Sequence, residues 1–150
     1  TESSLKVSTR FSEEEIARFL SDSNYVPDSM REIEITLAGD NRFIASSVID
    51  LDHIEVPRSE DLLNPMNYLQ GQLPMVIKAK VYSEAGRGRL EIERVELAGI
   101  ELPDVLVREM IARYTRSVNN PDGWDIDAFY AFPYRIEEVR VDSGEVILVQ

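Results

Sequence analysis

The stretch Met75-Val-Ile-Lys-Ala-Lys-Val-Tyr-Ser-Glu-Ala-Gly-Arg-Gly-Arg-Leu-Glu-Ile92 decides the fold class. From Met75 to Val81 every second residue is apolar, and Leu90 and Ile92 continue this apolar set after the glycine-containing segment 85–88. A period of two is typical of a strand with one buried face, and the glycines suit a tight turn. The stretch therefore predicts a long antiparallel hairpin.

The alternation slips just after Glu93. Val95 and Leu97 are in phase with each other but out of phase with Leu90 and Ile92. A slip of one residue turns every side chain to the other face of a sheet, unless the strand contains a β-bulge that restores the phase. We therefore expect either a β-bulge or a strongly twisted strand past Glu93, and a bend of the sheet at this point.

Two further hairpins are predicted on either side of this one. Residues 33–37 and 43–51 each alternate between apolar and polar side chains, and Gly39-Asp-Asn41 between them has turn chemistry. Near the end of the chain, 134–141 and 145–149 are predicted strands joined by a turn at 142–144. Together the hairpins predict a curved antiparallel sheet of about six strands.

Two helices and one shorter helical segment are predicted. Ser12 and Glu15 have the spacing of a capping box, which predicts a short helix over about 12–22 whose apolar residues, Phe19 among them, are buried. Pro103 suits the first turn of a second helix, because its missing N–H costs nothing there. The segment 64–71 predicts a short surface helix.

The second helix is predicted to be the main one. Its apolar residues recur at helical spacing through about residue 118, at Leu106, Val107, Met110, Ile111, Tyr114 and Val118. The expected architecture is a single α+β domain over residues 1–150, with 1–9 as a flexible N-terminal lead. In it the curved sheet wraps around the long amphipathic helix, and the short N-terminal helix lies beside them.

Composition excludes several classes of protein. With 28 Asp and Glu against 16 Lys and Arg, the 150-residue chain has a net charge of −12, which disfavours binding to nucleic acid or to an anionic membrane. The chain has no Cys, so disulfides, thiolate metal sites and cysteine nucleophiles are excluded. No window approaches 18 uninterrupted apolar residues, so no transmembrane segment is expected.

Signals for catalysis are weak. His53 is the single histidine, and no Gly-x-Ser-x-Gly elbow is present, which disfavours a catalytic triad. Asp122, Asp125 and Asp127 are the most concentrated carboxylates, but their spacing does not match a calcium loop, so a solvated acidic turn is the favoured interpretation. We therefore expect no catalytic residues, no metal, no cofactor and no enzymatic activity.

The aromatic residues and the methionines give the most informative signal. Trp124 and the segment 129–134 form an aromatic cluster, and Met66, Met75 and Met110 add flexible apolar volume. On residue type alone an ordinary core is the favoured interpretation of these residues, and an apolar groove is the functional alternative. A groove of this kind suits an acyl chain, which has no directional groups.

The order of these elements resembles a known family. The capped helix Phe11–Leu20, the run Val95-Glu-Leu-Ala-Gly-Ile-Glu-Leu-Pro103 into an amphipathic helix, and the closing Phe132-Pro-Tyr-Arg-Ile-Glu-Glu-Val139 segment resemble small bacterial exported proteins of the tubular lipid-binding superfamily. That superfamily includes the bactericidal permeability-increasing protein and periplasmic phospholipid-binding proteins. The likeness covers most of residues 10–150 and is architectural.

The resemblance implies a lipid tail in the seam between sheet and helix, and a periplasmic or otherwise extracytoplasmic location. The chain as given carries no signal peptide, so the location follows from the resemblance alone. Candidate ligand-binding residues are the inward side chains of the strands and of one helix face, which are equally the expected core: Leu37, Phe43, Ile77, Val81, Leu106, Met110 and Tyr114.

The predicted function is non-enzymatic binding of lipid or another hydrophobic ligand in the bacterial cell envelope. The alternative is a structural or protein-interaction domain without a small-molecule ligand, in which strand edges and the segment 52–73 contact a partner. A carboxylate-based hydrolase that uses Asp122, Asp125 or Asp127 is a third hypothesis, and it requires those groups to lie in a cleft.

Overall fold

The computed structural model describes residues 6–22, 28–53, 60, 62–64, 67–116, 118 and 120–150, with His53 and Tyr114 described by their backbone alone. Strands dominate this part of the chain. The elements are β1 (Ser8–Ser12), α1 (Glu13–Asp22), β2 (Met30–Gly39), β3 (Arg42–Asp50), the 3-10 turn η1 (Leu51–His53), β4 (Gln72–Glu84), β5 (Arg87–Leu97), β6 (Ile100–Glu101), α2 (Asp104–Tyr114), β7 (Tyr130–Ala131), β8 (Glu138–Asp142) and β9 (Glu145–Val149).

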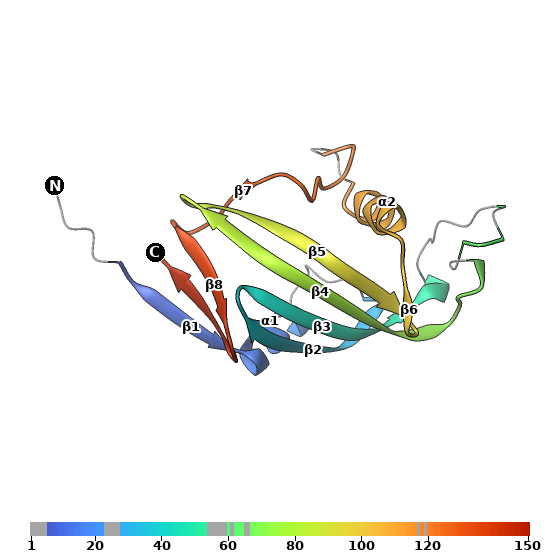
Figure 1. Cartoon of the computed structure of the whole chain (residues 1–150), viewed down its shortest axis with the longest axis horizontal. Coiled ribbons are helices and arrows are strands. Elements are labelled where there is room, and N and C mark those ends of the chain that lie inside the picture. The colour runs from blue at the N-terminus through green and yellow to red at the C-terminus, as the bar shows by residue number, and fades with distance from the viewer. Residues whose placement is uncertain are drawn as a thin grey trace.

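The strands form two antiparallel sheets. The larger has the order β2-β3-β4-β5-β6, and β7 pairs with the start of β5. The smaller has the order β1-β9-β8. Figure 1 shows long curved strands β2 to β5, with α2 beside one end of β5 and the small sheet beside the other.

The predicted fold class, an α+β domain in which one curved sheet wraps around a long amphipathic helix, is wrong. The described residues contain no long helix, and their strands form two sheets. They form two short helices, of 10 and 11 residues, and the molecule is mostly β. Helix α2 is about 16 Å long at 1.5 Å per residue, whereas the 13-residue β4 extends for about 43 Å. Helix α2 therefore covers only part of the sheet.

Helix α2 ends at Tyr114, four residues earlier than predicted, because the chain folds back onto its last turn. The Thr115 hydroxyl donates to the Ile111 carbonyl at 2.7 Å, and the Trp124 backbone N–H donates to the same hydroxyl at 2.6 Å. A Cβ atom at Gly123 would lie 2.1 Å from the carbonyl oxygen of Ala112. Val118, predicted to continue the apolar stripe, is 99% exposed.

The hairpin predictions are confirmed by the strand register. Residues 39–41 form the turn between β2 and β3, and all three have positive φ. In the next hairpin Lys78 pairs with Arg94 while Ala79 pairs with Ile92, which leaves Glu93 as the extra residue of a bulge. The bulge returns the residues beyond it to the face that carries Ile92.

The N-terminal segment departs from prediction in two ways. The capping box is present, since the Ser12 backbone N–H donates to Glu15 Oε1 at 3.0 Å and the Glu15 N–H donates to Ser12 Oγ at 3.1 Å. Phe19, however, is 61% exposed instead of buried. Strand β1 begins at Ser8, inside the predicted flexible lead, because Ser8–Ser12 pairs with β9. The predicted last two strands thus belong to a separate sheet.

One face of the large sheet carries two apolar clusters. The first, here called the α1 half, centres on Ile35, Leu37 and Val141 and is covered by α1, β8 and β9. The second, here called the α2 half, lies under α2 and contains the buried residues Ile49, Leu51, Leu69, Val95, Leu97, Leu102, Leu106 and Val107. The opposite face carries ion pairs, such as Arg94 with Glu96 at 2.6 Å. The sheet is therefore half-buried, as the alternation of its sequence predicts.

Candidate functional site

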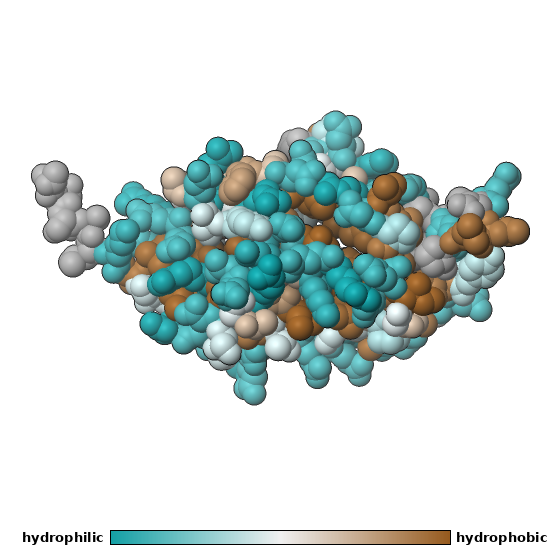
Figure 2. Space-filling model, in the orientation of Figure 1, coloured by the Kyte–Doolittle hydropathy of each residue, from teal (hydrophilic) through white to brown (hydrophobic). Residues whose placement is uncertain are grey.

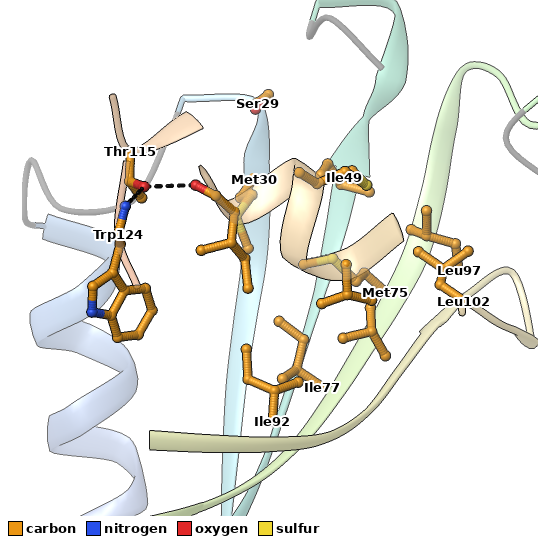
Figure 3. A pocket seen from close by; sticks show the side chains of 14 residues that line it. Ser29, Met30, Ile49, Met75, Ile77, Ile92, Leu97, Leu102, Thr115 and Trp124 are labelled. Atoms are coloured by element: carbon orange, nitrogen blue, oxygen red, sulfur yellow. Dashed lines mark hydrogen bonds between the residues drawn. The ribbon is translucent and has the colours of Figure 1, made fainter. Parts of the chain in front are cut away.

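An apolar pocket of about 320 Å³ lies between α2 and the α2 half of the sheet. Figure 2 shows apolar side chains between the positions of α2 and β5, and Figure 3 shows how the labelled side chains lie around the space. The lining consists of Ser29, Met30, Ile49, Met75, Ile77, Ile92, Val95, Leu97, Leu102, Val107, Met110, Ile111, Thr115 and Trp124.

Strand register brings the sheet side of this lining together. Met75 is opposite Leu97, and Ile77 is opposite Val95, so these side chains share one face. Without the bulge at Glu93, Val95 and Leu97 would point to the charged face instead. The bulge is therefore the local feature that completes the floor of the pocket.

Helix α2 and the segment after it form the other wall. Val107, Met110 and Ile111 are spaced three and four residues apart, so they lie on one helix face. Trp124 reaches this wall because its backbone N–H donates a hydrogen bond to the Thr115 hydroxyl, which is drawn in Figure 3. Its ring also lies 6.2 Å from the ring of Tyr130, at an interplanar angle of 51°. Trp124 is the single tryptophan of the chain.

An ion-pair network ties the 120–128 segment to the outer side of α2. Arg108 donates from Nη1 to Asp127 at 2.7 Å and from Nε to Asp104 at 2.7 Å. The hydrogen bonds from Arg108 lower the pKa of the Asp127 carboxyl, and they raise the pKa of the guanidinium. The Asp127 backbone N–H also donates to Asp125 Oδ1 at 3.0 Å. These carboxylates hold the segment in place.

The same geometry argues against the hydrolase hypothesis. The Asp127 side chain is 61% exposed and paired with Arg108, while Asp122 and Asp125 are also outside the pocket lining. Within the described residues, no group of three or more His, Asp or Glu side chains is arranged to hold a metal ion. None of the lining residues that the structure describes has a titratable side chain, and the surface that they present suits an apolar group.

The structure separates the seven predicted ligand-binding residues. Ile77 and Met110 line the pocket, and Leu106 is buried in the cluster beneath α2 without lining the space. Leu37, Phe43 and Val81 belong to the α1 half instead. The side chain of Tyr114 lies outside the described residues, as do Pro65 and Met66 of the predicted surface helix.

Sequence reasoning missed most of the other lining residues, although signals for several were present. Ile92, Val95 and Leu97 are apolar but interrupted by a slip in the alternation, and the bulge makes them one surface. Met75 and Trp124 have the residue types expected of a groove, and both line the pocket. Met30 had no local signal, because it precedes the alternating part of β2.

A second, larger groove of about 740 Å³ lies between α1, β9 and the segment 133–136. It contains exposed aromatic residues, with Phe19 61% and Tyr134 83% exposed. Its lining also includes the charged residues Glu15, Arg18 and Asp22. Charged side chains thus form part of the lining of this groove, which makes it a weaker fit to an apolar ligand.

Comparison of the chain with protein-family models, curated proteins and solved structures gives no match. Neither helix of the described part is long and apolar enough to cross a membrane.

Proposed function

We propose that this protein binds a small hydrophobic ligand, such as part of an acyl chain, in the pocket under α2, and that it performs no chemistry on the ligand. One observation carries the proposal: the α2 half of the core contains an open apolar space, not a filled one. Protein interiors are normally close-packed, so separating a filled core would cost about as much as ligand burial returns. A space that already exists removes this cost.

The exposure of the lining supports this interpretation. Met30, Met75, Ile77, Ile92, Met110 and Ile111 are half-buried, although all six belong to the covered α2 half. Three of them are methionines, whose unbranched and polarizable side chains adapt to ligands of different shape. The surface that a ligand would remove from water is therefore already assembled and adaptable.

The volume limits the size of the ligand. An apolar cavity of about 150 Å³ accommodates benzene, so the space here suits a group of on the order of a dozen non-hydrogen atoms. A complete phospholipid with two long chains exceeds it. The proposal is therefore a single short chain, or one end of a longer chain whose remainder lies outside. Action in the bacterial envelope is part of the proposal through the family resemblance.

The experiment uses Trp124 as an intrinsic reporter, since it is the single tryptophan and lies in the pocket wall. Purified protein comprising residues 1–150 is titrated with 1-decanol while tryptophan emission is recorded. We expect saturable binding with a blue shift, because the ligand displaces water from the indole. Native mass spectrometry of gently purified protein should also show bound lipid or decanol at one molecule per chain.

A matched pair of variants locates the site. The double substitution Ile92→Phe with Ile111→Phe fills the space with two rings from opposite walls, and it should reduce decanol binding by at least ~10-fold. Val105→Phe places a ring on the same helix at a residue that is 77% exposed, and it should leave binding unchanged. Absence of saturable binding to the wild-type protein, or equal binding by the filled variant, would contradict the proposal and favour the protein-interaction alternative.

A further inference from the structure

A buried hydroxyl on the pocket side of the sheet points to the chemical class of the ligand. Ser47 is 7% exposed, and its Oγ atom has no hydrogen-bond partner among the described residues. A buried polar atom without a partner is unusual, because it loses its bonds to water without replacement. Within the described residues it is the one buried side-chain oxygen or nitrogen in this condition.

The register places Ser47 beside the pocket. Ser47 is directly opposite Met75, and it lies two residues from Ile49 on the same face of β3. Both of these neighbours line the pocket, as does Ile77 at the diagonal position. Ser47 is not itself among the residues that line the pocket. A rotation of the flexible, unbranched Met75 side chain would open the Ser47 hydroxyl to a ligand there.

Charge limits the ligand further. The lining residues that the structure describes include no Lys, Arg or His, so a carboxylate or phosphate inside the pocket would have no cation there to pair with. The two arginines of α2 are engaged elsewhere, Arg108 with Asp104 and Asp127, and Arg113 with Glu109 at 3.1 Å. The net charge of −12 adds repulsion of anions at longer range.

We infer that the pocket selects an uncharged ligand that carries one hydrogen-bonding oxygen, such as a ketone, ester or alcohol, with that oxygen bound by the Ser47 hydroxyl. This inference rests on the proposed function, since it concerns the same pocket. The hydrocarbon part of the ligand contacts the methionines and the α2 wall, while the oxygen lies at the sheet. The pocket thereby discriminates against free fatty acids, which have the same chain but a charged end.

The test compares three ligands of similar length by Trp124 emission at about pH 8, where a fatty acid is ionised. These are 2-decanone, which is neutral and accepts a hydrogen bond, 1-decene, which is neutral and accepts none, and decanoate, which is charged. We expect 2-decanone to bind about five-fold more tightly than 1-decene, the factor that corresponds to one net hydrogen bond. Decanoate should bind at least ~10-fold more weakly than 2-decanone, because its charge has no partner in the pocket.

Ser47→Ala isolates the hydroxyl. It should lower the affinity for 2-decanone to that for 1-decene and leave the affinity for 1-decene unchanged or higher. Ser46→Ala is the control, because residue 46 is the adjacent strand position, whose side chain lies on the opposite face of the sheet. It should change neither affinity.

The outcomes separate this inference from the proposed function. If 2-decanone and 1-decene bind equally and Ser47→Ala changes neither, the hydroxyl does not contact the ligand and the inference is overturned while the pocket stands. Tightest binding by decanoate would also overturn it. If none of the three ligands binds, the proposed function itself fails.

Discussion

The two halves of the apolar sheet face differ in whether a pocket lies against the strands, although the same strands run through both. In the α1 half, one helix and two strands of the small sheet close over the face, and Leu37 and Val141 are 4% and 2% exposed. In the α2 half, a single short helix and the segment behind it leave a space of about 320 Å³. The groove of about 740 Å³ beside the α1 half is lined by no residue of β2 to β5, whereas the pocket under α2 lies directly against these strands. The apolar content of the strands alone therefore does not determine where open space remains against the sheet.

Gly123 offers the strongest test of how the α2 half is built. At φ +81° an added Cβ would be strained, and it would also lie 2.1 Å from the Ala112 carbonyl oxygen. We expect Gly123→Ala to lower the free energy of unfolding by about 3 kcal/mol or more and to detach the Trp124 segment from α2. Urea denaturation followed by far-UV circular dichroism measures this.

Gly144→Ala is the matched control. Gly144, in the turn between β8 and β9, has almost the same φ, +82°, but nothing lies within 4 Å of the position that an added Cβ would take. This substitution should cost about 1 kcal/mol, which is the backbone strain without the collision. Equal losses in the two variants would show that the contact between Gly123 and α2 does not exist in solution.

Side-chain truncation compares the two halves directly. Leu37→Ala removes a side chain from the filled half and should cost about 3 kcal/mol, because a cavity remains in close-packed surroundings. Met110→Ala removes a side chain that already borders open space, so it should cost about 1 kcal/mol. Chemical denaturation gives both values. A Met110→Ala loss as large as that of Leu37→Ala would mean that the pocket is closed in solution.

The starts of the two helices provide a smaller contrast. Helix α1 begins with the Ser12–Glu15 capping box, whereas α2 has Pro103 at its N-cap and no side-chain cap hydrogen bond. Ser12→Ala should therefore cost about 1 kcal/mol of unfolding free energy. Pro103→Ser, which supplies a capping hydroxyl to α2, should cost less or be neutral. Thermal denaturation of both variants checks that Ser12→Ala loses more stability than Pro103→Ser. A Ser12→Ala variant as stable as wild type would contradict the role of the capping box.

Local patterns predicted the local structure of this protein well. The capping box of α1, the three hairpins and the bulge near Glu93 all depend on residues close in sequence, and all are present. Pairing of β1 with β9 could not be foreseen, because Ser8–Ser12 has no alternating apolar pattern and pairs with residues at the far end of the chain. The sequence therefore indicated strands without showing that they divide into two sheets.

The pocket could be predicted only in part, for a related reason. Apolar residues of a core and of a pocket look alike in sequence, and their difference depends on where the covering helix ends. That end is set by the contacts of Thr115 and Gly123 with the returning chain, which are tertiary contacts. The helical spacing up to Val118 suggested four more helical residues, and a longer α2 would have covered more of the sheet.

The pH dependence of stability gives the smallest effect, and it involves one carboxyl group beside each half. Hydrogen bonds from Arg108 lower the pKa of Asp127 in the α2 half, and hydrogen bonds from Ser12 lower the pKa of Glu15 in the α1 half. A carboxyl whose pKa is lower in the folded state stabilises the fold above its unfolded pKa, about 4, and loses this contribution as the pH falls through the folded value. Asp127→Asn and Glu15→Gln should each be less stable than wild type at neutral pH, with the difference shrinking in acid.

Ligand binding distinguishes these two carboxylates where stability alone does not. Asp127 helps to hold the segment that carries Trp124, so Asp127→Asn should also weaken binding of 1-decanol at neutral pH. Glu15 lies at the start of α1 and does not line the pocket, so Glu15→Gln should leave binding unchanged. Urea denaturation across a pH series, with the Trp124 titration at neutral pH, measures both effects. Equal changes in binding for the two variants would mean that the pocket responds to global stability and not to the ion pair that positions its wall.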